Sequence, residues 1–184
     1  MHVRTVRHAV HHAAAPCHRR ERAPRSEAGH FFQHRLYNGT FPTITHCNPH
    51  NIHLASSAIC AWTEGFSDAV AAYLLGDQRC VFPNGDSTSF AHVAAWQTGA
   101  HVQGDVAASL LQLWNQVDGS WNRSITTLAA NTPATFADWF RNVRPTAVPP
   151  LSTTSTALTA LDTHAINYGP APQGLPWWQR RIEI

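Results

Sequence analysis

Residues 26–39, with the sequence SEAGHFFQHRLYNG, contain the pattern on which the interpretation of the rest of the chain depends. Glu27 and His30 are three residues apart, so both would lie on one face if this stretch is a helix. An imidazole four residues before His30 would complete a pair able to hold Zn²⁺ on that face. Ser26 occupies that position, so the stretch is one residue short of a zinc-binding helix.

Residues 60–68, with the sequence CAWTEGFSD, carry a second acidic pattern. They form an apolar helical segment with Glu64 and, one turn later, Asp68. Together the two stretches resemble the gluzincin metallopeptidases. In that family H-E-x-x-H supplies two zinc ligands and a general base, and a Glu on a second helix supplies the third ligand.

The resemblance is to secreted bacterial zincin-like proteins that pair H-E-x-G-H-[FW] with W-x-E-G-[FW]-[AS]-[DT], and it covers roughly residues 26–140. Residues 103–115 also resemble their V-E-G-x-V-A-x-x-L-W-D helix. This chain departs from that pattern, because Gln103 replaces the Glu and Asn115 replaces the Asp.

The resemblance implies a mainly α fold, of the α+β zincin-like type with a helical C-terminal part, whose upstream sheet is missing here. It implies that His30 and Glu64 bind Zn²⁺, that Glu27 takes the proton from the attacking water, and that Asp68 orients a ligand imidazole. It also implies a peptide or protein substrate and a secreted or cell-envelope location.

Ser26 divides the functional prediction into two classes. A neutral hydroxyl is a poor zinc donor beside imidazole, so we expect zinc binding by this chain to be weak or absent. The first class is a zinc metallopeptidase that hydrolyses peptide bonds if its site is complete. The alternative is an inactive relic, or a non-catalytic binding module of the same fold.

Composition predicts one folded domain. The chain has 184 residues, of which 43% are hydrophobic, enough for one core. We expect the domain to span residues 26–168, followed by a C-terminal tail over residues 169–184. No segment reaches the length of about 20 apolar residues that a membrane helix needs.

Residues 1–25 carry a net charge of +5, against −3 for the remainder. Arg clusters of this kind can bind nucleic acid, but a solvated, disordered tail explains the charge without such a partner, and we predict no nucleic-acid or membrane partner. A second hypothesis is that residues 1–26 are read in a shifted frame, which would also account for the lost His. No apolar signal-peptide core is visible near Met1.

Further histidines and cysteines leave alternatives open. His30 and His34 form an i, i+4 pair, which we interpret as a surface feature because no further ligand lies at a partner spacing in that helix. Cys47 and Cys60 bracket a loop with three histidines, and their spacing fits no standard zinc module. We therefore predict a disulfide between them, and the pairing of two further cysteines stays open: Cys17 and Cys80.

Helical periods and stop signals predict the remaining elements. The first helix should run from the Ala23-Pro24 region to Tyr37, and the Glu64 helix should end at Gly76-Asp77. Further helices are expected at about 102–116, 135–140 and 151–168, with residues 40–59 and 87–101 mostly irregular.

Overall fold

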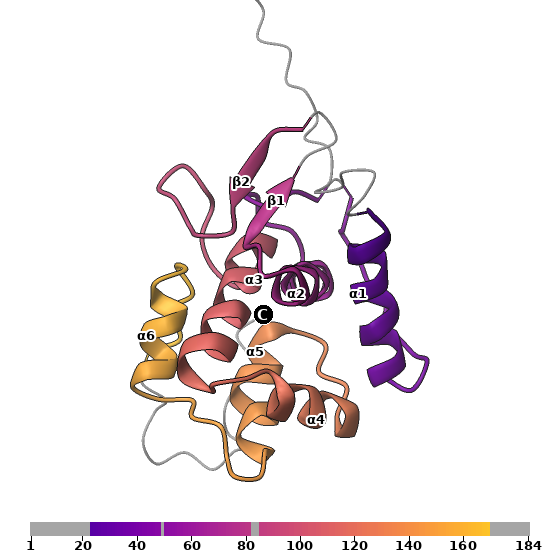
Figure 1. The fold of residues 1–184 in the computed structure, drawn as a ribbon, viewed down its shortest axis with the longest axis vertical. Helices are drawn as coiled ribbons and strands as arrows, with labels where there is room; N and C mark the ends of the chain where they lie inside the picture. The colour runs from indigo at the N-terminus through magenta and orange to yellow at the C-terminus, as the bar shows by residue number, and fades with distance from the viewer. Residues whose placement is uncertain (1–22, 49, 82–84, 170–184) are drawn as a thin grey trace, which may run out of the picture.

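Helix α2 (Ala58–Leu75) is the centre of the domain. The computed structural model describes residues 23–48, 50–81 and 85–169. Ser57 caps the start of α2 by accepting a hydrogen bond from the Cys60 backbone N–H, and Gly76, with φ of 63°, ends it. Most residues between these caps are buried on all sides, as expected for a helix with neighbours on several faces (Figure 1).

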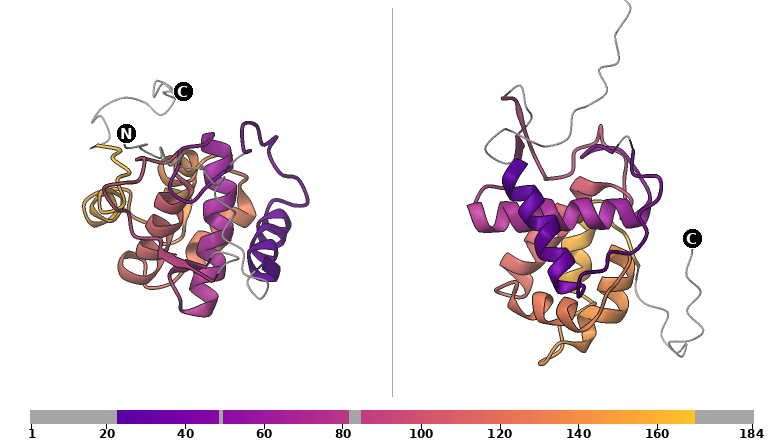
Figure 2. Two further views of the ribbon diagram at one scale, coloured as in Figure 1. Left: turned by 90° about the horizontal axis from the view of Figure 1, so that it is seen from above. Right: turned by 90° about the vertical axis from the view of Figure 1, so that its right-hand side faces the viewer.

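Helix α1 (Ala23–Leu36) crosses one face of α2 (Figure 2). The two helices approach closely at Gly29, where a Cβ atom would lie 2.7 Å from the Ser67 carbonyl oxygen. At the end of α1, the Tyr37 hydroxyl accepts from the Trp62 indole N–H at 2.9 Å and donates to the Pro133 carbonyl at 2.6 Å. This chain of hydrogen bonds fixes α1 against α2 and the C-terminal part of the domain.

Helix α3 (Gln103–Gln112) packs against α2 on another side and continues as a π-helical turn, η1 (Leu113–Val117). The contact is close at Gly65, where a Cβ atom would lie 2.8 Å from both the Gln103 carbonyl oxygen and the Val106 side chain. A glycine in each interface therefore brings α1 and α3 close to α2.

The C-terminal helices complete the core, with α4 and α5 below α2 and α6 beside α3 (Figure 1). They are α4 (Asn122–Ala130), α5 (Phe136–Asp138), η2 (Trp139–Val143), η3 (Arg144–Thr146) and α6 (Thr156–Asp162). Thr135 caps α5 by accepting from the Asp138 backbone N–H at 3.1 Å. Trp139 then stacks on Trp62 of α2, with ring centroids 5.8 Å apart.

A short antiparallel sheet follows α2, and its strands are β1 (Arg79–Val81) and β2 (Ser87–Ser89). Cys80 pairs with Thr88 in its register. The predicted mainly α fold is confirmed, and the sheet found among the described residues lies after α2 in the chain.

Most predicted helix boundaries agree with the structure. The first helix and the Gly76 stop are as expected, whereas the 151–168 prediction was too long, since α6 covers seven residues. Helix α4 was not predicted, because its Asn, Ser and Thr residues are weak helix formers. Residues 1–22 and 170–184 lie outside the described residues, so the two predicted tails fall largely beyond them. No helix in the described ranges is long and apolar enough to cross a membrane.

Candidate metal centre

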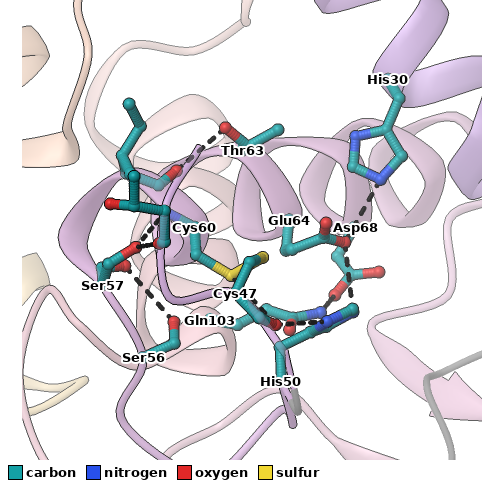
Figure 3. Close-up of a disulfide and its surroundings, with 12 residues drawn as sticks. His30, Cys47, His50, Ser56, Ser57, Cys60, Thr63, Glu64, Asp68 and Gln103 are labelled. Atoms are coloured by element: carbon teal, nitrogen blue, oxygen red, sulfur yellow. Dashed lines mark hydrogen bonds and ion pairs between the residues drawn. A yellow bond between two sulfur atoms is a disulfide. The ribbon is translucent and has the colours of Figure 1, made fainter. Parts of the chain in front are cut away.

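The crossing of α1 and α2 brings His30 opposite Glu64. The Nε2 atom of His30 lies 3.2 Å from Oε2 of Glu64, and the side chains are 22% and 16% exposed (Figure 3). The helices can approach this closely because Gly29, the residue before His30 on α1, carries no Cβ atom and lies against Ser67 of α2. Two residues that the sequence places far apart thus meet at the edge of the core.

Nearby carboxylates control the charge of His30. Burial lowers the pKa of its imidazole, but the hydrogen bond and charge of Glu64 act in the opposite direction. The charges of Glu27 and Asp68 add to this effect, and the pKa of His30 ends above its ordinary value. The carboxylates around His30 therefore favour positive charge at this position.

Asp68 lies one turn after Glu64 and is buried. Its Oδ2 atom accepts a hydrogen bond of 2.6 Å from Nε2 of Gln103 on α3 (Figure 3). Burial raises the pKa of Asp68 to about 7, against the lowering effect of that hydrogen bond. Its predicted role in orienting a ligand imidazole stays a prediction, supported so far by its charge acting on His30.

Cys47 and Cys60 form the disulfide that the sequence predicted. Cys60 lies one helical turn before Glu64, so the bond holds Cys47 beside the face of α2 that carries Glu64 (Figure 3). Cys80 is also disulfide-bonded and buried, but the question of a pairing with Cys17 lies outside the described residues.

This disulfide also positions His50, which was not among the predicted site residues. His50 Nε2 lies 3.6 Å from the same Glu64 Oε2 atom that His30 approaches. Its Nδ1 atom is 3.0 Å from the Cys47 carbonyl oxygen, which accepts the ring N–H. The sequence contained a signal for the proximity of His50 to Glu64. His50 follows one bridged cysteine by three residues, and Glu64 follows the other by four.

The other predicted site residues are placed as follows. Ser26 lies in α1 one turn before His30, and its side chain is outside the described part of the structure. Glu27 is exposed on the same helix and close enough for its charge to act on His30. His34 packs its ring on Phe41, with centroids 5.4 Å apart, in agreement with its interpretation as a surface feature.

The donor set fits a zinc ion in its chemistry. Imidazole nitrogen and carboxylate oxygen are ordinary zinc ligands, and ligand atoms of a tetrahedral site with bonds of about 2.0–2.1 Å lie about 3.3 Å apart. The separation of His30 Nε2 from Glu64 Oε2, 3.2 Å, is close to that value. His50 Nε2 lies 3.6 Å from the same oxygen, but the ligand atoms of these three residues do not all lie within 4.8 Å of one another, so the two imidazoles do not surround one metal position. The Sγ atoms of Cys47 and Cys60 lie beside His50, but they are joined to each other and are not thiolates.

Comparison with known proteins identifies the family. The model of the Mycolysin C-terminal domain matches residues 7–165, and this domain is found in secreted bacterial zinc metallopeptidases. No curated protein and no solved structure matches the chain significantly. The expected relationship to secreted bacterial zinc metallopeptidases is confirmed at this level, while the gluzincin ligand set stays a prediction. Because the family model matches most of its length, this chain belongs to the Mycolysin C-terminal domain family.

Proposed function

We propose that this domain is the zinc-binding part of a secreted metallopeptidase, with His30 and Glu64 as metal ligands. The observation that carries the proposal is the 3.2 Å approach of His30 Nε2 to Glu64 Oε2 across the α1–α2 crossing. Membership of a family found in zinc peptidases supports it. The disulfide fits export, because such bonds persist in oxidising compartments.

Zinc held there would supply Lewis-acid activation of a water molecule and of a peptide carbonyl. Glu27 is the general base of this proposal, since it is exposed, carries a carboxylate and lies within charge range of His30. Asp68, held by Gln103, contributes negative charge behind His30 and keeps its imidazole oriented. The substrate class is a peptide or protein.

The alternative function is a non-catalytic module of the same fold, and Ser26 favours it. A hydroxyl at the position of the first imidazole leaves His30 and Glu64 as the two ligands of the expected motif. Disturbing even an outer partner of a metal ligand typically costs about 10- to 100-fold in affinity or activity. We therefore propose that peptide hydrolysis by the chain as written is weak or absent.

The test restores the missing ligand. Ser26→His should place imidazoles at i and i+4 on α1, raise zinc affinity at least about 10-fold and produce hydrolysis of an unfolded protein substrate. In that background Glu27→Gln should abolish hydrolysis while the bound zinc remains, and Ser26→Ala serves as the control for the substitution itself.

Two results would contradict the proposal. One is a folded Ser26→His variant that takes up no more zinc than the Ser26→Ala control. The other is an unchanged zinc content when Glu64→Ala is added to Ser26→His. Circular dichroism and thermal unfolding of each variant establish that it is folded, so that a loss of zinc reports on the ligand set.

A further inference from the structure

We draw no further inference here: the strongest candidate, the buried cluster in which Asp105 of α3 contacts His92 of the loop before α3 and His164 lies within range of the His92 charge, rests only on the raised pKa of Asp105 and the lowered pKa of His164, which change stability with pH in opposite directions.

Discussion

Arg144 and Asp118 form a charged pair that is closed to solvent, whereas Glu64 and its two histidines are partly open to it. The guanidinium of Arg144 meets both carboxylate oxygens of Asp118 at 2.6 Å, and its Nε atom donates to the Ser152 carbonyl at 2.7 Å. The two side chains are 0% and 2% exposed. Each of these three guanidinium nitrogens therefore donates to an oxygen acceptor.

The Glu64 cluster differs in both exposure and composition. Two imidazoles approach one carboxylate oxygen, and the neutral Ser26 stands where the H-E-x-x-H motif of the resembled gluzincins has its first histidine. In a closed, fully paired cluster every donor and acceptor already has a partner within the protein, so no atom is left to bind a ligand. An open cluster rich in ligands has the opposite property, and this is why we assign function to the Glu64 region and structure to the Arg144 region.

The largest effect is expected at the closed pair. Arg144→Ala leaves the carboxylate of Asp118 buried without its partner, which should lower the free energy of unfolding by about 3 to 5 kcal/mol. Urea denaturation measures the loss. The control is Arg79→Ala, whose partner Asp77 lies 3.6 Å away at a largely exposed site and should cost about 1 kcal/mol or less. Similar losses for both variants would mean that water reaches the Arg144 pair.

The disulfide beside the open cluster should stabilise the fold. Replacing both Cys47 and Cys60 by Ala should lower the free energy of unfolding by about 2 to 3 kcal/mol, on the chain-entropy estimate for a closed loop of this size. Urea unfolding curves of the parent and the double variant measure the loss. Equal stability of the two proteins would show that the bond does not restrict the unfolded chain.

A third polar cluster is intermediate between these two in its exposure to solvent. Buried Asp105 accepts from the Gly99 backbone N–H at 3.1 Å and contacts His92 Nδ1 at 2.8 Å. Burial raises the pKa of Asp105 to about 6, against the lowering effects of His92 and Gly99. Because the folded state holds this proton more tightly than the unfolded state, the contribution of Asp105 to stability is fully present below about pH 4 and is lost as the pH rises through about 6.

The matching measurement compares the parent with Asp105→Asn from pH 4 to pH 7. The stability of the parent relative to the variant should fall by on the order of 2 kcal/mol across this range. The contribution of His164 to stability changes with pH in the opposite direction, since burial and the charge of His92 lower its pKa to about 4. Because His164 is present in both proteins, this contribution cancels in the comparison. A constant difference between the two proteins would show that Asp105 titrates in the folded state as it does in the unfolded state.

The smallest effect concerns the helix crossing that creates the open cluster. A glycine to alanine change within an exposed helix normally stabilises it by up to about 1 kcal/mol. Gly29→Ala should instead destabilise by about 1 to 2 kcal/mol, because the new methyl group would meet the Ser67 backbone. It should also weaken zinc binding by moving His30 away from Glu64. Thermal unfolding decides the sign, and a more stable variant would show that α1 and α2 can separate freely.

The sequence by itself determined most of the helices and the choice of several candidate site residues. Capping residues, glycine stops and apolar periods are local signals, so α1, α2 and α3 could be located from them. Helix α4 was missed because its Ser and Thr residues are weak helix formers and only packing makes the segment helical. His30, Glu64 and the Cys47–Cys60 pairing could be singled out because each belongs to a recognisable pattern.

Only the tertiary structure decided which residues meet. The approach of His30 to Glu64 depends on Gly29, which allows α1 and α2 to cross closely, and no local pattern encodes a distance between helices. The place of His50 depends on two spacings joined through a disulfide, so its relation to Glu64 exists only after the covalent bond forms. The Asp118–Arg144 pair carried no sequence signal, because a buried ion pair is defined by the removal of water, and water is removed only when the whole chain packs.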